Sequence, residues 1–343
     1  MAETAASTDR PSAWRMPAEW SPHERCVVAW PTRDDLWGGH AAEARREYAA
    51  IVAAVGRFEP VLVVAVPGRA NEVRACCGSD VDVVELPIDD SWVRDSGPIF
   101  VVDNDGHRAG VDFRFNAWGN KLPDYAEDDR LPARLLARLG LPRVVSDMVL
   151  EGGSISVDGE GTLLATEQCL LHPNRNPNLT RAQIEDELRL RLGVESVVWL
   201  PHGSAPDSMT DGHVDGVCVF ARPGVVLLQS DAPGSPYAER YAANRRALEA
   251  ARDARGRRLE IVEAPRLAFA DVDGKRVRVP LVNVYLANGG VVAPVSPDEP
   301  ADDWLGTLRA VFPERDIVPV PVRILPWSGG AIHCVTQQLP KGA

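Results

Sequence analysis

Four stretches of the chain carry hydrophobic residues at the three- and four-residue spacing that buries one face of a helix. The first stretch is followed by Gly56, a residue type that commonly ends helices. In the second, Thr180 and Gln183 form the pattern of a capping box, which marks a helix start. The predicted helices cover residues 44–55, 180–193, 237–255 and 304–312, the third having the least regular stripe.

Short β-branched runs, often closed by proline, lie between the helical stretches and are typical of buried strands. Five of them start 60, 54, 64 and 56 positions apart, and near-even spacing is typical of a repeat architecture. Each period holds one helix and three strand-like segments. The five runs are Val83–Pro87, Arg143–Asp147, Val197–Pro201, Ile261–Pro265 and Ile317–Pro321.

Five such units in one chain predict a closed ring, a propeller-like α/β domain, because no Pro/Gly/Ser-rich linker interrupts the series. Proteins of the α/β class also alternate helices and strands at comparable spacing in general, so the spacing alone leaves that alternative open. We expect residues 1–15 to form a flexible lead-in and residues 16–343 to form a single domain.

Polar segments follow the five runs at a similar place in each repeat. In a ring, equivalent ends of equivalent units meet at the axis, so side chains far apart in the sequence are expected to share one site. These segments are Asp89–Pro98, Glu151–Ser154, Thr210–Gly216, Asn283–Gly290 and Gly329–Cys334.

Composition narrows the class of protein. Of 343 residues, 45% are hydrophobic and 25% are charged, which is ordinary globular composition and excludes wholesale disorder. The formal net charge is −12 and no block of Lys and Arg occurs. Nucleic acid and anionic membranes are therefore not expected as partners, whereas a small cationic substrate fits this charge.

The sequence lacks the motifs of several kinds of functional site and the segments that direct a protein into a membrane or out of the cell. The six cysteines include no CxxC pair, which argues against a zinc ribbon or a thioredoxin-like site. No P-loop, GxSxG or GxGxxG motif occurs. The apolar runs are too short to span a membrane, and the first twenty residues lack the apolar core of a signal peptide. We therefore expect a cytoplasmic protein with reduced thiols.

The segment DGHVDG offers an imidazole and carboxylates at alternate positions. On a strand, His213, Asp215 and Asp211 would face the same way and approach one ligand together. Cys334 follows GGAIH near the end of the chain. A thiolate beside a histidine forms a nucleophile–base arrangement, in which the thiolate attacks a carbon and the histidine protonates the leaving group.

The segment Asp89–Asp95 is suited to a cation, because Trp92 offers a π-face and the aspartates offer acceptors. The same residues allow other interpretations. Asp211, His213, Asp215 and Glu151 could ligate a divalent metal in a metallohydrolase. An unreactive ligand-binding module is a third alternative, and the HxD spacing alone does not separate these.

The motifs WVRDSGP, EGGSISVDGEGT, TDGHVDG and GGAIHC occur in that order across nearly the whole chain. Together they resemble the agmatine deiminases of the guanidine-modifying superfamily. This resemblance implies a fivefold pseudosymmetric α/β propeller of ββαβ-type units, in agreement with the even spacing. It also implies hydrolysis of a guanidinium to a urea with release of ammonia, without a metal or an organic cofactor, and a possible homodimer. For agmatine the product would be N-carbamoylputrescine.

Carried over by motif, the resemblance implies Cys334 as nucleophile and His213 as general acid and base. It implies that Asp95 and Asp215 clamp the guanidinium nitrogens and that Glu151 orients the substrate and the histidine. A guanidinium is a planar cation that stays protonated in water and matches paired carboxylates.

One position departs from the family pattern. The resemblance implies an acidic residue four positions before the catalytic histidine, where this chain has Met209, so the recognised tail of the substrate is an open question. Asp90 and Trp92 are further candidates for the tail site, as is Trp118. His333 would face away from Cys334 on a strand and is expected to be structural.

Overall fold

A computed structural model describes residues 14–205, 207, 209–264 and 266–343 of the chain. Most of the predicted lead-in, residues 1–13, lies outside the described residues. Arg15, which the prediction placed in the lead-in, exchanges two backbone hydrogen bonds of 2.9 Å with Val102. No helix among the described residues is long and apolar enough to cross a membrane.

Five sheets share one pairing pattern, an antiparallel pair followed by a parallel pair. A separate hairpin pairs β13 (Ala268–Val272) with β14 (Lys275–Val279). The sheets are β18 (Thr336–Pro340)–β1 (His23–Ala29)–β2 (Val61–Ala65)–β3 (Asp82–Glu85); β4 (Ile99–Val102)–β5 (Arg108–Arg114)–β6 (Arg143–Val149); β7 (Ile155–Val157)–β8 (Thr162–Thr166)–β9 (Ser196–Leu200); β10 (Cys218–Arg222)–β11 (Val225–Gln229)–β12 (Glu260–Ala264); and β15 (Tyr285–Ala287)–β16 (Gly290–Val295)–β17 (Asp316–Pro321).

The five predicted β-branched runs correspond to β3, β6, β9, β12 and β17. Each of these is the final parallel strand of its sheet, which explains their even spacing along the chain. A parallel pair needs a crossover connection, usually a helix, so each sheet takes up a similar length of sequence. The mixed α/β class predicted from the sequence is confirmed.

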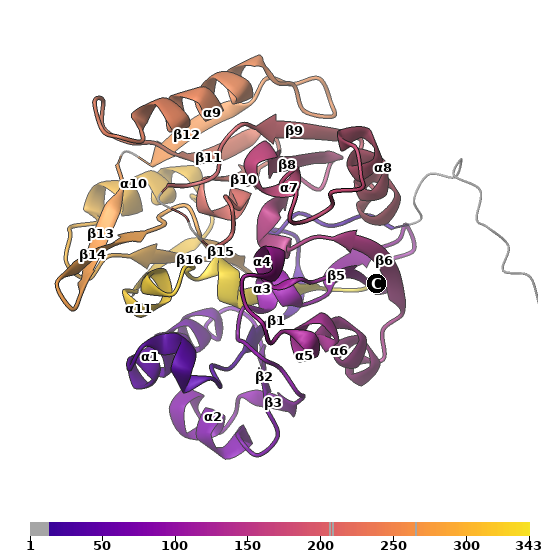
Figure 1. The fold of residues 1–343 in the computed structure, drawn as a ribbon, viewed down its shortest axis with the longest axis vertical. Helices are drawn as coiled ribbons and strands as arrows, with labels where there is room; N and C mark the ends of the chain where they lie inside the picture. The colour runs from indigo at the N-terminus through magenta and orange to yellow at the C-terminus, as the bar shows by residue number, and fades with distance from the viewer. Residues whose placement is uncertain (1–13, 206, 208, 265) are drawn as a thin grey trace, which may run out of the picture.

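Helices connect the parallel strands of each sheet. Figure 1 shows the long helices toward the outside of the molecule and the short α3 near its centre. The capping box at Thr180 is present, with the Gln183 N–H donating to the threonine hydroxyl. These helices are α1 (Ala41–Val55), α2 (Ala70–Cys77), α6 (Leu131–Leu139), α8 (Arg181–Leu192), α9 (Ala238–Ala250) and α10 (Asp302–Val311).

Three of the four predicted helices are confirmed within a few residues by α1, α8 and α10. The predicted helix over 237–255 is too long, because α9 ends at Ala250 and Ala251 has extended backbone angles. The hydrogen-bonded turn over 253–257 that follows is held by the Asp253 carboxylate, which accepts from the backbone N–H groups of Arg255 and Arg257. This side-chain bonding offers the backbone an alternative to the helix.

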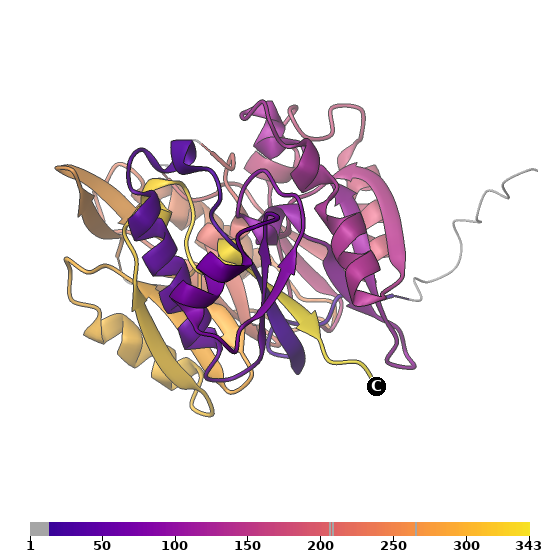
Figure 2. The same ribbon diagram turned by 90° about the horizontal axis from the view of Figure 1, so that it is seen from below.

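The two ends of the described chain are joined in one sheet, because the last strand, β18, pairs antiparallel with the first, β1. Figure 2 shows the yellow C-terminal strand beside the indigo N-terminal region. The stripe of α1 packs into the largest hydrophobic cluster, as its spacing predicts. From this stripe the Tyr48 hydroxyl donates to Ser91 Oγ at 2.9 Å and so fixes the segment that leads into α3.

Candidate active site

Short single-turn helices precede the first strand of four sheets and lie together at the centre of the molecule. The turn η2 contacts both α3 and η3, and α3 also contacts η4. These elements fall within the polar segments that the sequence singled out. They are α3 (Val93–Ser96) before β4, η2 (Gly152–Ser154) before β7, η3 (Val214–Gly216) before β10 and η4 (His333–Val335) before β18.

The prediction that His213 and Asp215 lie on a strand is wrong. Asp211 has a positive φ of 58°, residues Val214–Gly216 form a 3₁₀ turn, and β10 begins only at Cys218. The turn still directs the imidazole and the Asp215 carboxylate toward one cavity, whereas Asp211 points elsewhere.

Gly153 marks the point where three of the predicted residues meet. A Cβ atom placed on this glycine would lie 2.6 Å from His213 Nδ1, 2.8 Å from Asp95 Oδ1 and 3.0 Å from Asp215 Oδ2. A side chain at position 153 would therefore displace the charged groups of the site. The neighbouring Gly152 is equally constrained, since its Cβ would lie 2.2 Å from the Arg94 carbonyl oxygen.

Asp95 is fixed by two donors inside the protein. Trp118 Nε1 donates to its Oδ2 at 2.9 Å, and the Gly153 N–H donates to its Oδ1 at 3.0 Å. Burial raises the pKa of Asp95 above its usual value, and the nearby charge of Asp215 adds to this, while His213 acts in the opposite direction. A cation beside this carboxylate would relieve that cost.

His213 is a buried imidazole among negative groups. Its Nδ1 lies 3.7 Å from Asp95 Oδ1, and neither ring nitrogen has a hydrogen-bond partner among the described residues. Burial alone would lower its pKa, but the charges of Asp95 and Glu151 raise the pKa of His213 well above the usual value. The imidazole is therefore poised to hold and release a proton.

Glu151 lies beside this histidine. Its Oε1 accepts a 2.6 Å hydrogen bond from Arg175 Nε, and its Oε2 is buried without a partner in the part of the chain described. One oxygen of Glu151, a ring nitrogen of His213 and the Cys169 sulfur lie within 4.8 Å of one another. The buried guanidinium of Arg175 supplies a positive charge here already, which disfavours a second cation at this cluster.

Cys334 lies on η4 with 7% of its surface exposed. Its Sγ is 3.5 Å from Asp215 Oδ2 and 3.4 Å from Asn283 Nδ2. Burial raises the pKa of the Cys334 thiol well above its usual value, and the charges of Asp215 and Asp95 raise it further. The thiol is therefore held protonated until a further cation enters the site.

The prediction that His333 faces away from the site is wrong, because residues 333–335 form a 3₁₀ turn rather than a strand. His333 Nδ1 lies 2.8 Å from Asp215 Oδ2, the same oxygen that faces Cys334. Burial alone would raise the pKa of Asp215, but the hydrogen bond and charge of His333 lower it below the usual value.

Two cavities of about 350 and 360 Å³ adjoin Cys334. The first contains Trp92, Asp90 and Trp118, all three predicted as tail-site candidates, together with Asp95. The second contains His213, Asp215, Asn283 and Arg278. Both cavities are lined by Met209, Thr210, Trp327, Gly329 and Gly330.

Two of the three tail-site candidates, Trp92 and Asp90, are held by different kinds of contact. Trp92 stacks on Trp37 with ring centroids 6.0 Å apart. Asp90 Oδ1 accepts from the Ser91 N–H at 2.7 Å, and burial raises the pKa of Asp90 to about 6. Asp90 is therefore a carboxylate whose charge at neutral pH depends on its surroundings.

The metal set considered from the sequence is not assembled. Asp211 Oδ1 pairs with Lys121 Nζ at 2.6 Å, and its Oδ2 pairs with Arg175 Nη1 at 2.6 Å. This carboxylate is therefore used by two cations and does not join His213 and Asp215 as a ligand. Among the described residues a second close group, Asp103, Asp105 and His107, lies at the surface in the turn between β4 and β5.

Sequence reasoning missed several residues of this site. Asn283 Nδ2 donates to the Asp215 carbonyl oxygen at 3.2 Å, and Asn283 Oδ1 accepts from the His333 N–H at 3.0 Å. Its place at the start of the fourth polar segment was the signal that could have identified it. Gly153 carried the same signal, because it lies within the second polar segment, whereas Arg175 carried none, because its role depends on contacts with distant Glu151 and Asp211.

A family profile described as Porphyromonas-type peptidyl-arginine deiminase matches residues 15–340. Among curated proteins, the chain is 44% identical over 362 residues to an agmatine deiminase of Stutzerimonas stutzeri, and the match covers 98% of both chains. The motif order that suggested a resemblance therefore extends through the whole sequence.

Solved structures of agmatine deiminases are also similar to this chain. The fold matches the agmatine deiminase of Enterococcus faecalis, described as catalysing its reaction, with a TM-score of 0.91, 32% identity and 96% of each chain covered. It also matches a cysteine-to-serine variant of a C. jejuni agmatine deiminase with substrate bound, with a TM-score of 0.87 and 26% identity, covering 96% of this chain and 97% of the other.

Proposed function

The chain belongs to the Porphyromonas-type peptidyl-arginine deiminase family, and we propose that it hydrolyses a small guanidino compound, with agmatine as the expected substrate. The observation that carries this proposal is the convergence of Asp95, His213 and Asp215 around Gly153, with Cys334 in contact with Asp215. Relatives of similar length that are named agmatine deiminases support the choice of substrate.

Binding is proposed to rest on charge. A guanidinium is planar, carries five N–H donors and pairs bidentately with carboxylates. Asp95 and Asp215 are both buried and lie close enough to contact the same glycine position. A substrate cation between them would relieve their mutual repulsion and replace the hydration that burial removed.

The nucleophile is proposed to be activated by the substrate itself. Asp95 and Asp215 are two of the groups that raise the pKa of Cys334. When a guanidinium neutralises them, the pKa of the thiol falls and its proton leaves to water as the cation enters. The thiolate then attacks the central guanidinium carbon, forming a carbon–sulfur bond and a tetrahedral adduct.

His213 then acts as the acid and afterwards as the base. Its raised pKa keeps it protonated in the free enzyme, so it can donate a proton to the departing nitrogen, which leaves as ammonia. The remaining amidino-thioether on Cys334 is attacked by water, whose proton returns to His213. Collapse of this second adduct expels the thiolate and releases the ureido product, which for agmatine is N-carbamoylputrescine.

Glu151 is proposed to orient His213, because one of its oxygens lies within 4.8 Å of a ring nitrogen and Arg175 fixes the carboxylate through Oε1. Positioning of this kind maintains the reacting groups in line and lowers the entropic part of the barrier. Trp92 and Asp90 are proposed to contact the aliphatic tail and its terminal group from the cavity on the Asp95 side.

We propose further that the five sheets are blades of a fivefold α/β propeller of ββαβ-type units. Their common pairing pattern and the closure of the first sheet by β18 support this arrangement. In such a ring the segments that precede each first strand face the axis, which accounts for a site drawn from all five polar segments.

Met209 is proposed to influence whether agmatine or another guanidino compound is the substrate. It lines both cavities at the position where the family resemblance implies an acidic side chain. A different guanidino compound is therefore the alternative substrate, with a tail that requires no carboxylate at this position.

Release of ammonia tests the proposal. Purified protein is incubated with agmatine, arginine and 4-guanidinobutyrate, and ammonia and ureido product are measured together. We expect stoichiometric release from at least one compound and the greatest kcat/KM with agmatine. Absence of release from all of them would overturn the proposal.

Cys334→Ser is the matched variant for this assay, and Cys218→Ser, at a buried thiol on β10 outside the cavities, is its control. The first change should reduce turnover by about 10³-fold or more, and the second should leave it unchanged. Turnover by Cys334→Ser at more than a few per cent of the original would contradict the nucleophile assignment.

A further inference from the structure

His333 bridges two carboxylates in the interior of the protein. Its Nδ1 lies 2.8 Å from Asp215 Oδ2 and its Nε2 lies 2.8 Å from Glu19 Oε2, with 6% of its side chain exposed. An ionised carboxylate only accepts hydrogen bonds, so a ring nitrogen on each carboxylate carries hydrogen and the imidazole is a cation. Burial and Arg94 oppose this charge, but Glu19 and Asp215 raise the pKa of His333 above its usual value.

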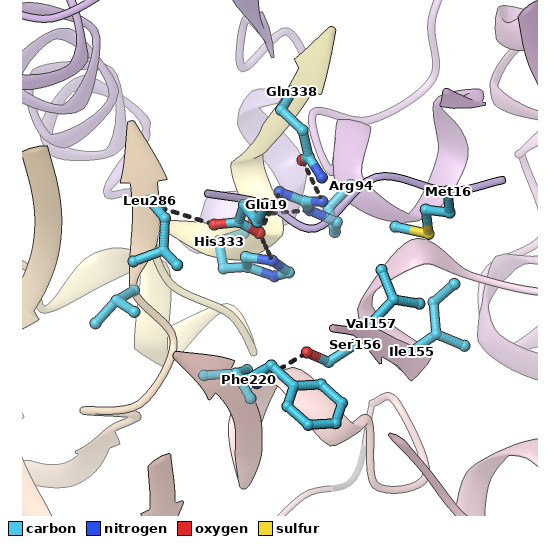
Figure 3. A pocket seen from close by; sticks show the side chains of 12 residues that line it. Met16, Glu19, Arg94, Ile155, Ser156, Val157, Phe220, Leu286, His333 and Gln338 are labelled. Carbon is cyan, nitrogen blue, oxygen red and sulfur yellow. Dashed lines mark hydrogen bonds and ion pairs between the residues drawn. The ribbon is translucent and has the colours of Figure 1, made fainter. Parts of the chain in front are cut away.

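Glu19 is itself held in place from the segment that precedes β1. Its Oε1 accepts a 2.7 Å hydrogen bond from the Leu286 N–H, and its Oε2 lies 3.6 Å from Arg94 Nη2. Figure 3 shows Glu19 between the His333 ring and the Arg94 guanidinium. Burial alone would raise its pKa, but His333 and Arg94 lower the pKa of Glu19 to about 2.

Arg94 completes the series from α3, one residue before Asp95. Its Nε donates to the His333 carbonyl oxygen at 3.2 Å and its Nη1 donates to Gln338 Oε1 at 2.8 Å. The charges thus alternate from Arg94 to Glu19, His333 and Asp215, and the last of these touches the Cys334 sulfur.

The surroundings of this series are mostly apolar. A cavity of about 20 Å³ beside Glu19, Arg94 and His333 is lined by the side chains of Met16, Ile155, Val157 and Phe220, among others (Figure 3). The low exposure of His333 and Arg94 and the apolar lining strengthen the interactions among these charges.

We propose that Glu19 and His333 are positioning residues of the deiminase site, which keep Asp215 ionised, oriented and compensated beside the Cys334 nucleophile. This inference rests on the proposed function, because it assigns Asp215 the guanidinium and Cys334 the attack. Without a cation behind it, the Asp215 charge 3.5 Å from Sγ would disfavour the thiolate. His333 supplies that cation, and Glu19 stabilises the proton on His333 against Arg94.

The direction of the pH effect follows from these contacts. The charged groups that face His333 are Asp215 from η3, Glu19 from the segment before β1, and Arg94 from α3. Removal of the Glu19 charge leaves Arg94 as the nearest opposing cation, so the pKa of His333 falls. The imidazolium is then lost at a lower pH, and kcat is expected to decline from that pH upward.

The test compares kcat and KM across pH 5.5–9.5 for the wild type, Glu19→Gln, His333→Gln and the double variant. We expect Glu19→Gln to keep kcat within about threefold at low pH and to lose about tenfold at high pH, with its basic limb moved to lower pH. His333→Gln should lose about tenfold or more throughout. The double variant should be no worse than His333→Gln, because Glu19 acts through His333.

Glu59→Gln is the matched control, since Glu59 is a buried carboxylate on another histidine, His23, away from Cys334. Its kcat profile should run parallel to that of the wild type. A Glu19→Gln profile lowered equally at every pH, or a double variant in which the two losses multiply, would overturn the positioning role.

A spectroscopic measurement separates this inference from the proposed function and from failure of a variant to fold. In ¹⁵N-histidine-labelled wild-type protein at pH 7, the His333 signals, assigned by their loss in His333→Gln or by sequential backbone correlation, should show hydrogen on both ring nitrogens. A neutral tautomer would overturn the proposal even in an active enzyme. A doubly protonated ring in a protein that releases no ammonia would instead place the failure on the proposed function.

Discussion

Two of the three buried histidines in the described part of the chain are hydrogen-bonded to carboxylates, and one of these two lies at the site. On β1, His23 Nδ1 lies 3.1 Å from both oxygens of Glu59, and the Tyr285 hydroxyl donates to Glu59 at 2.6 Å. On η4, His333 lies between Glu19 and Asp215. Both imidazoles are nearly inaccessible, so burial and charge pairing alone do not mark a functional residue.

The difference lies in what each pair touches. The His23 cluster, formed by His23, Glu59 and Tyr285, connects β1 with β15. Glu59 Oε2 also accepts from the Asn288 N–H at 2.8 Å, so the polar groups of this cluster hold two sheets together. The His333 cluster, formed by Glu19, His333 and Asp215, ends at Asp215 Oδ2, which faces both the Cys334 thiol and a cavity. A buried ion pair therefore indicates function when one of its members also faces space that a ligand can enter.

The largest expected effect is a loss of activity, and it distinguishes the His333 cluster from the His23 cluster. Asp215→Asn removes the charge proposed to bind the guanidinium while keeping the size of the side chain, so kcat/KM should fall by about 10³-fold, on the order of 4 kcal/mol in the transition state. Steady-state kinetics with agmatine measures this loss. A loss smaller than tenfold would show that the His333 cluster, like the His23 cluster, is only structural.

The next effect should appear in stability. Glu59→Gln leaves buried polar groups of His23 and Tyr285 without their charged partner, which we expect to cost about 1–3 kcal/mol of unfolding free energy. Thermal unfolding should show a fall of several degrees in Tm. Activity per folded molecule should stay within twofold, and a selective loss of kcat would mean that this cluster also communicates with the site.

A third effect compares two thiols, one near each histidine. Asp215 is one of the groups that raise the pKa of Cys334, so Asp215→Asn should lower that pKa and speed alkylation by iodoacetamide at pH 7.5 by about tenfold. Cys26, fully buried near Glu59, should stay unmodified in the native protein. Peptide mass mapping distinguishes the two, and equal labelling would contradict the electrostatic account of Cys334.

The smallest effect is on acid stability. The folded pKa of Glu19 is about 2 against an ordinary value of 4.5, so its contribution to stability is full above pH 4.5 and is lost as the pH falls toward 2. Glu19→Gln should therefore flatten the stability curve in that window by about 1–2 kcal/mol. Chemical denaturation between pH 2.5 and 5 measures it, and an unchanged slope would contradict the ion pair.

The sequence predicted those features that depend on local pattern. The five β-branched runs identified the last strand of each sheet, and Thr180 identified the start of α8. The motif residues Asp95, Glu151, His213, Asp215 and Cys334 lie around one centre because each lies in the segment that precedes the first strand of its sheet.

The remaining errors have physical causes. His213, Asp215 and His333 lie in or beside 3₁₀ turns, whose side-chain directions differ from the strand alternation that was assumed. Asp211 pairs with Lys121 and Arg175, which lie in the connections between β5 and β6 and between β8 and β9. Glu19 meets His333 across 314 positions of sequence, a contact that no local pattern contains.

The pairing of β18 with β1 has a consequence for the stage of synthesis at which the enzyme becomes active. Cys334, the proposed nucleophile, lies just before β18, and Glu19 lies shortly before β1, so the proposed site draws on residues near both ends of the described chain. A polypeptide in which β18 has not yet been made has no Cys334 thiol at the centre and an unclosed first sheet. Catalysis is therefore expected to begin only after β18 has been synthesised and has paired with β1.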